Sequence, residues 1–134
     1  METPRGHDRK LVVCLYEGLG MMFFAYLVIV SGVTGSDTWG ITGPLALFVS
    51  ITLFGGVSGG HMNPAVTLGI YVKEAKYAHN LQFMLMTIGS QMAGALLGML
   101  MSVVSLRIPK NGEWTVEMPA PLLLPSTVSK EMVE

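Results

Sequence analysis

The sequence has little charge and almost no cysteine. Only 13% of its 134 residues are Asp, Glu, Lys or Arg, whereas a soluble domain usually has about 25%. The single cysteine, Cys14, excludes an internal disulfide framework and a cysteine-rich metal site. The net charge is −1 without a basic block, so nothing in the chain suits nucleic acid. These shortages argue against a disordered chain and against an ordinary soluble domain.

Apolar residues are abundant instead, at 51% of the chain. They form three long runs, at 11–34, 41–57 and 81–106. The first run carries a single charge, Glu17, and at 1.5 Å per residue its helix would be roughly 36 Å long, enough to cross a hydrocarbon core of about 30 Å. The third run is uncharged, and the second is at the short end for a crossing. The sequence therefore predicts an integral membrane protein with three transmembrane helices.

A fourth, shorter helix is predicted within 58–72. Asn63 is a good N-cap and Pro64 suits the first helical position. The apolar stretch that follows is too short to cross a bilayer, so it must be re-entrant or interfacial. The remaining segments are predicted as a polar tail at 1–10, a turn at 35–40, a loop at 73–80 and a Pro-rich extended tail at 107–134. The expected fold class is all-α, with three spans and one half-helix.

Basic residues predict the orientation of these spans. Three lie in the N-terminal tail and two in the 73–80 loop, which three crossings plus a re-entrant segment place on one side. The other side has only Arg107 and Lys110 near a span. Because loops rich in Lys and Arg stay in the cytoplasm, the N-terminus is predicted to be cytoplasmic.

The segment Ser58–Leu68, SGGHMNPAVTL, resembles the first signature loop of the aquaporins, or major intrinsic proteins. Glu17 and Gly20 resemble that family's ExxG pattern, and Gln91 and Gly94 its QxxG pattern. The resemblance runs from about residue 11 to the end of the chain and covers the first of the family's two inverted repeats. It implies half of a channel for passive transport of water or small neutral solutes, not an enzyme, with no cofactor.

The short helix has physical properties that suit such a channel. A helix that begins at Asn63 leaves its first N–H groups unpaired, and if its N-terminus lies at mid-membrane, the positive end of its dipole lines a cavity there. The carboxamide of Asn63 can cap the helix with its oxygen and offer its N–H groups to a passing solute, while the positive end repels cations and protons. Unpaired carbonyls at 58–62 are expected to line the same path. A plain capped turn is the alternative. The predicted pore residues are Asn63, Pro64, Ala65, His61, Gly60 and Gly43.

Gly43 enters that set through the resemblance. Counted back from Asn63, it falls where the family's narrow filter takes a residue from the second span. Glycine there implies a wider filter that favours solutes larger than water.

Other residues are expected to support the loop and pack the helices. Glu17 is expected to hold the 58–62 loop through His61 or backbone N–H groups, rather than to lie at the interface or carry protons. For His61 we favour a Glu17 partner over a pore liner or a core residue. Gln91 should hydrogen-bond between helices, and Gly94 and Gly98 have the GxxxG spacing of a close helix contact. No metal site is expected, because no second ligand has suitable spacing to His61.

The resemblance covers one repeat, without a second Asn-Pro-Ala. A pore needs two half-helices from opposite leaflets, and copies in one orientation cannot supply them. Three explanations remain open: the N-terminal part of a longer channel, a natural half that pairs with a separate second half, or a non-conducting structural subunit of a larger membrane assembly. The expected partners are the lipid bilayer and a second half or other membrane subunits. The family's homotetramer is expected only if the second half is present.

Overall fold

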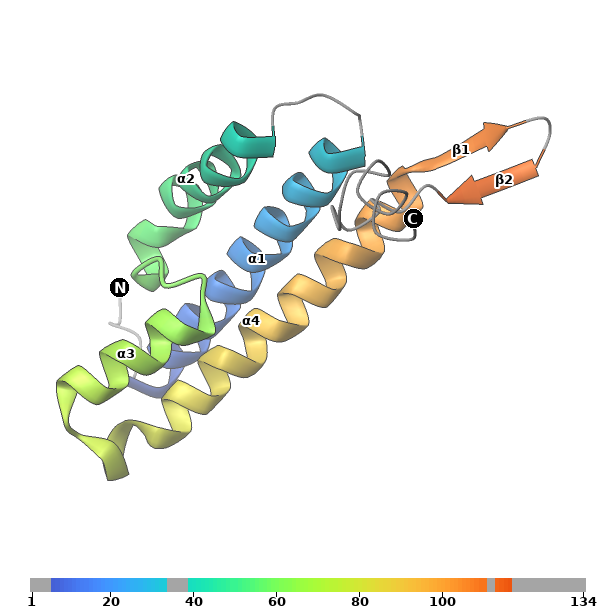
Figure 1. Cartoon of the computed structure of the whole chain (residues 1–134). Coiled ribbons are helices and arrows are strands. Elements are labelled where there is room, and N and C mark those ends of the chain that lie inside the picture. The colour runs from blue at the N-terminus through green and yellow to red at the C-terminus, as the bar shows by residue number, and fades with distance from the viewer. Residues whose placement is uncertain (1–5, 34–38, 111–112, 117–134) are drawn as a thin grey trace, which may run out of the picture.

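A computed structural model of the chain describes residues 6–33, 39–110 and 113–116. Three helices in these residues are long and apolar enough to cross a membrane, and α3, with 11 residues, is only about 16 Å long. The predicted architecture of three spans and a half-helix is therefore confirmed (Figure 1). The elements are α1 (Gly6–Val33), α2 (Trp39–Ser58), α3 (Pro64–Glu74), α4 (Tyr77–Ser105), β1 (Arg107–Lys110) and β2 (Glu113–Val116).

The loop predicted at 73–80 is much shorter than expected. Helix α3 continues to Glu74 and α4 already begins at Tyr77. Lys and Glu are good helix formers, so a polar stretch next to an apolar run does not by itself mark a helix end. The turn is made instead by Ala75, which has the left-handed conformation with φ of 53° and donates its N–H to the carbonyl of Val72.

The beginning of the predicted tail is also different. Strands β1 and β2 pair antiparallel, with Arg107 opposite Val116 and Lys110 opposite Glu113. The two residues between them in the sequence are Asn-Gly, the pair most typical of a short hairpin connection. That signal predicts the hairpin, and the proline content of the segment obscures it. The rest of the tail, beyond Val116, and most of the turn predicted at 35–40 lie outside the described residues.

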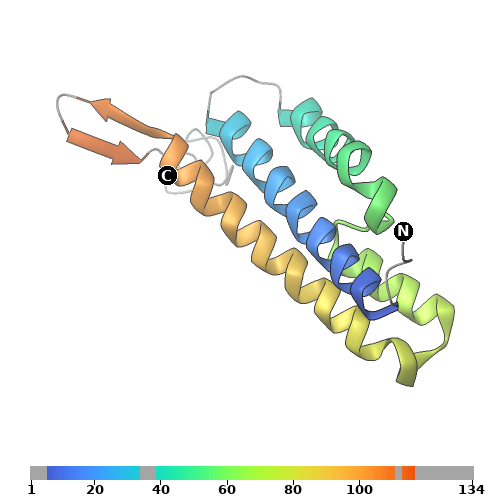
Figure 2. The same cartoon turned by 180° about the vertical axis from the view of Figure 1, so that it is seen from behind.

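Helix α1 lies between α2 and α4 and packs against each by a different means (Figures 1 and 2). Against α2 the contact is aromatic, because the ring of Phe54 meets those of Tyr16 and Phe23 edge to face, at centroid distances of 6.3 and 6.1 Å. Against α4 the contact is close backbone packing. A Cβ atom on Gly94 would run into the carbonyl of Gly18 on α1. Small residues are what allow helices to approach this closely in a membrane.

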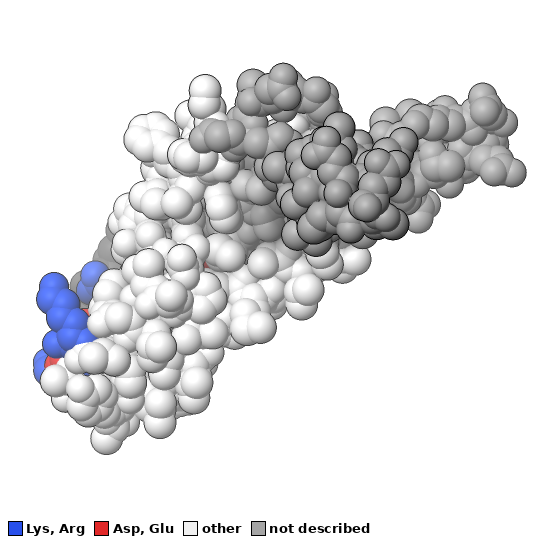
Figure 3. All heavy atoms as spheres, viewed as in Figure 1, with Lys and Arg blue, Asp and Glu red and all other residues white. Residues whose placement is uncertain are grey.

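Charged side chains gather at one end of the described part. Figure 3 shows Lys and Arg at the end where α1 begins and α3 turns into α4. The described basic side chains are Arg9, Lys10, Lys73 and Lys76. The surface of the spans is apolar instead, with exposed side chains such as Leu15, Phe48 and Leu85. This separation is typical of a protein whose middle lies in lipid and whose end lies in water.

The left-handed turn at Ala75 gives a first testable prediction. An L-residue with a side chain pays about 1–2 kcal/mol in this conformation, and glycine does not. Glycine loses more backbone entropy on folding, so Ala75→Gly should stabilise the protein by about 0.5–1 kcal/mol. Thermal unfolding in detergent measures the effect. Ala93→Gly, in the middle of α4, is the control and should destabilise by about 1 kcal/mol. A loss of stability in Ala75→Gly would contradict the prediction.

Candidate functional site

Glu17 is the centre of a buried polar cluster. Its side chain is 0% exposed, and its carboxylate accepts three hydrogen bonds. Oε1 accepts the backbone N–H of His61 at 2.9 Å. Oε2 accepts the backbone N–H of Met62 at 2.6 Å and the side-chain Nε2 of Gln91 at 2.8 Å. A buried carboxylate that is fully hydrogen-bonded in this way can tie two helices and a loop together.

The loop that Glu17 holds has an unusual backbone. Gly59 and Gly60 have φ values of 95° and 67°, which are routine for glycine. Met62 also has a positive φ, 39°, which a residue with a side chain rarely adopts. Its N–H is held by Glu17, and its side chain, 2% exposed, lies against Gly20. The strain at Met62 is thus compensated by one hydrogen bond and one buried side chain, both directed at α1.

The loop ends at Asn63, which caps α3. Its backbone is extended and its side-chain Oδ1 accepts the N–H of Ala65 at 2.8 Å. Pro64 takes the first helical position, where no N–H is needed. With the oxygen engaged, the carboxamide presents its N–H₂ group, and the Asn63 side chain is exposed. The site therefore offers hydrogen-bond donors at the positive end of a helix.

This donor group lies at mid-depth of the three spans. Gln91 is the central residue of α4, with fourteen residues on either side, and it donates hydrogen bonds to Glu17 and to Thr67 of α3. Helix α3 accordingly begins halfway along α4 and runs back toward the basic end (Figure 1). Within the described residues, the carbonyl oxygens of 59–62 accept no hydrogen bond. Donors and acceptors are thus both available at a depth where hydrocarbon would leave them unsatisfied.

The His61 ring makes no hydrogen bond to Glu17, although the backbone N–H of His61 does. Its ring Nδ1 lies 3.2 Å from the hydroxyl oxygen of Thr67, a residue 4% exposed on α3. His61 is therefore a partner of Glu17, as expected, but through its backbone N–H and not through its ring. The backbone N–H is closer to the carboxylate because the loop runs past α1, while the ring turns toward α3.

Thr67 joins this cluster from the first turn of α3. Its Oγ1 accepts a hydrogen bond from Nε2 of Gln91 at 2.9 Å and lies 3.2 Å from the carbonyl of Asn63. Gln91 itself is 0% exposed, and among the described side chains its Oε1 is the buried polar atom without a hydrogen-bond partner. The amide cannot turn over to satisfy that oxygen without placing it against the Glu17 carboxylate. Glu17 therefore fixes the orientation of Gln91.

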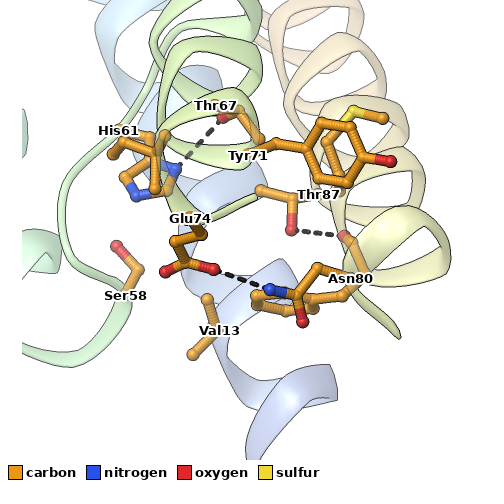
Figure 4. Close-up of a pocket in the computed structure, with 11 residues that line it drawn as sticks. Val13, Ser58, His61, Thr67, Tyr71, Glu74, Asn80 and Thr87 are labelled. Carbon is orange, nitrogen blue, oxygen red and sulfur yellow. Dashed lines mark hydrogen bonds between the residues drawn. The ribbon is translucent and has the colours of Figure 1, made fainter. Parts of the chain in front are cut away.

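A cavity of about 220 Å³ lies beside the cluster, between α1, α3 and α4. Figure 4 shows His61 and Thr67 at its upper part and the side chains of Glu74 and Asn80 joined across its lower part. Asn80 Nδ2 donates to Glu74 Oε2 at 2.6 Å. Asn63 is not among the residues that line this cavity. The cavity and the exposed carboxamide are therefore separate features.

The remaining predicted residues are spread over the fold. Gly94 and Gly98 lie in the α1–α4 contact, where added Cβ atoms would meet the carbonyls of Gly18 and Met22. Gly60 packs against the backbone of Gly55. Gly43 is far from the loop, in the opposite end of α2, and a Cβ atom there would meet nothing within 4 Å. Its predicted place in a filter stays a prediction.

Sequence reasoning missed three participants, namely Gly18, Met62 and Thr67. Thr67 stands in the signature segment, four residues after Asn63, so the helical period alone places both on one face. Met62 had no such signal, because a positive φ at a methionine is not a sequence property. In the described part of the chain, no group of three His, Cys, Asp or Glu side chains is placed to hold a metal ion.

Comparison with known proteins agrees with this geometry. The family profile "Major intrinsic protein" matches residues 11–131. Aquaporin-8 of Notomys alexis is 34% identical over 71 residues, which cover 49% of this chain and 27% of that protein. The chain thus matches about a quarter of the length of this curated relative, and no solved structure matches it. The profile spans the three apolar helices, the loop and α3. The chain is a multi-pass integral membrane protein and belongs to the major intrinsic protein family.

Proposed function

We propose that the chain forms half of a channel for water or small neutral solutes. The observation that carries the proposal is the exposed carboxamide of Asn63 at mid-depth of the spans. A pair of free N–H donors facing lipid would cost several kcal/mol. The cost disappears if the group faces a file of water. Family membership supports the same reading.

The loop supplies the complementary groups. The carbonyl oxygens of 59–62, which accept no hydrogen bond from the described residues, can accept from water, while Asn63 donates to it. A solute that has both donors and acceptors can then replace each hydrogen bond that it loses with one to the protein as it moves along the path. A cation is disfavoured, because the positive end of α3 repels it.

The described residues contain one half-helix at mid-depth, and an enclosed file requires a second from the opposite leaflet. We propose that an inverted repeat, in the same or a separate polypeptide, lies against the face of Asn63. We also place the basic end, with Lys73 and Lys76, on the cytoplasmic side because of its charge.

Stopped-flow swelling of lipid vesicles tests the proposal. Vesicles that contain this chain alone should show no water permeability above the lipid background. Vesicles that also contain the second repeat of Aquaporin-8 should swell faster. Asn63→Asp keeps an oxygen for the cap of α3 but removes both donors, and should lower that rate about tenfold, since one lost hydrogen bond of about 1.4 kcal/mol has this effect.

Asn80→Ala is the control, because it removes a carboxamide at the basic end, away from Asn63, without setting a second carboxylate against Glu74; its rate should match that of the unmodified chain. Equal rates for the Asn63 variant and the unmodified chain would overturn the pore role of Asn63. If cross-linking shows that the two halves associate and no added rate appears, the chain acts as a non-conducting structural subunit.

A further inference from the structure

The hydroxyl of Thr67 is placed to decide which ring nitrogen of His61 carries the proton. Three groups surround its Oγ1: Nε2 of Gln91 at 2.9 Å, the carbonyl of Asn63 at 3.2 Å and Nδ1 of His61 at 3.2 Å. A hydroxyl donates one hydrogen bond and accepts two. The protonation of His61 can therefore be deduced by assigning each of these three contacts a donor.

Two of the three assignments follow from chemistry. The amide nitrogen of Gln91 can only donate, and it is held in place by the Glu17 carboxylate. The carbonyl of Asn63 can only accept, and it already accepts the backbone N–H of Thr67 at 3.0 Å. If the hydroxyl proton also goes to this carbonyl, Oγ1 can accept from a protonated Nδ1, which gives one hydrogen bond more than donation of the hydroxyl proton to Nδ1 would. One lone pair of the Thr67 hydroxyl oxygen then remains. Nδ1 of His61, 3.2 Å away, can donate a hydrogen bond to it only if Nδ1 carries a proton.

We infer that Thr67 holds neutral His61 in the Nδ1–H tautomer. In the other tautomer, Nδ1 and the Asn63 carbonyl would compete for one hydroxyl proton, and a lone pair of the buried Thr67 would stay empty. The difference is one hydrogen bond, which corresponds to a population bias of roughly threefold to tenfold.

The consequence is an acceptor on the far edge of the ring. Nε2 has no hydrogen-bond partner among the described residues, and the ring is only partly buried. With Nδ1 protonated, Nε2 is a free lone pair. Asn63 and His61 would then be held in similar ways by residues of α3. The N–H of Ala65 occupies the side-chain oxygen of Asn63 and leaves its N–H₂ group as a donor. The hydroxyl of Thr67 occupies Nδ1 of His61 and leaves Nε2 as an acceptor. His61 lines the cavity between α1, α3 and α4, and Asn63 does not, so the tautomer is independent of the path proposed beside Asn63.

Nuclear magnetic resonance of the full chain in lipid nanodiscs tests the inference. The chain has three histidines, so ¹⁵N-histidine labelling of the His7→Gln, His79→Gln variant leaves His61 alone. At about pH 8.5, where free histidine is neutral, protonated and unprotonated ring nitrogens resonate apart. We expect the proton on Nδ1 in this chain and in Thr67→Ser, which keeps the hydroxyl. Thr67→Val should shift the population toward Nε2–H by at least threefold.

Thr52→Val is the matched control, because Thr52 donates to a carbonyl four residues back, as Thr67 does, but lies exposed on α2 away from His61; it should leave the spectrum unchanged. A proton on Nε2 in the unmodified chain overturns the inference, and so does an unchanged spectrum in a folded Thr67→Val protein. If that variant does not fold, the unmodified and Thr67→Ser spectra decide. A failure of the vesicle experiment would reject the proposed function and leave this result standing.

Discussion

Glu17→Ala should destabilise the folded protein by about 3–5 kcal/mol. The substitution removes an acceptor from three donors at once, the N–H groups of His61 and Met62 and the amide of Gln91. Each buried donor left unsatisfied costs about 1–3 kcal/mol, and the three are close enough that their costs do not simply add. The positive φ of Met62 loses its support in the same step. Unfolding by SDS in mixed micelles, followed by circular dichroism, measures the loss.

Glu17→Gln should cost less, about 1–3 kcal/mol. Its amide oxygen can take the place of Oε2 and accept from Met62 and Gln91, while its nitrogen faces the N–H of His61 and leaves one donor unpaired. Glu74→Ala is the control, because Glu74 is exposed at the basic end and should change stability little. If alanine at position 17 were as well tolerated as alanine at position 74, the loop would be held by something other than Glu17.

Gly94→Ala should destabilise the protein by about 3 kcal/mol. The new methyl group would run into the carbonyl of Gly18, which is backbone and cannot rotate away. Helices α1 and α4 must therefore separate, which also loosens the contact between Gly98 and Met22 one turn further along. Overpacking of this kind costs about 1–3 kcal/mol in soluble cores, and here backbone rather than a flexible side chain must yield. The same SDS titration measures the change.

Gly89→Ala supplies the matched control for this prediction. It makes the same substitution in the same helix, at a position where the methyl group would meet nothing within 4 Å. Because alanine has the higher helix propensity, this variant should be equal to or more stable than the unmodified chain, by up to about 1 kcal/mol. Similar stabilities for the two variants would show that the α1–α4 contact is looser than the structure has it.

The sequence is a good guide wherever a property depends on neighbours along the chain. The length of the apolar runs predicts the three spans, because a helix must match the thickness of the bilayer. Asn63 and Pro64 predict the start of the half-helix, because capping and the missing N–H of proline are local effects. The loop predicted at 73–80 is the exception. Polar residues there indicate contact with water, but the end of a helix can lie in water as readily as a loop can.

The polar cluster could be predicted only in part. An acid in an apolar run needs a partner, so Glu17 is identified from the sequence as a supporting residue. Its partners lie 44 to 74 residues away in the chain, and no local rule selects backbone N–H groups over the imidazole of His61. Only the folded loop, with its positive φ values at 59, 60 and 62, turns those groups toward α1 and the ring toward Thr67.

The sequence by itself determined three apolar segments long enough to cross a membrane and a capped half-helix, all within the described residues, because hydrophobic length and capping act within a segment. The tertiary structure decided which atoms meet: that α1 and α4 touch through backbone at Gly18 and Gly94, and that Glu17, Gln91 and Thr67 form one cluster. It also decided that the donors of Asn63 stay exposed at mid-depth. These are consequences of packing between distant segments, where hydrogen-bond geometry and the absence of a Cβ atom select one arrangement from the many that the pattern allows.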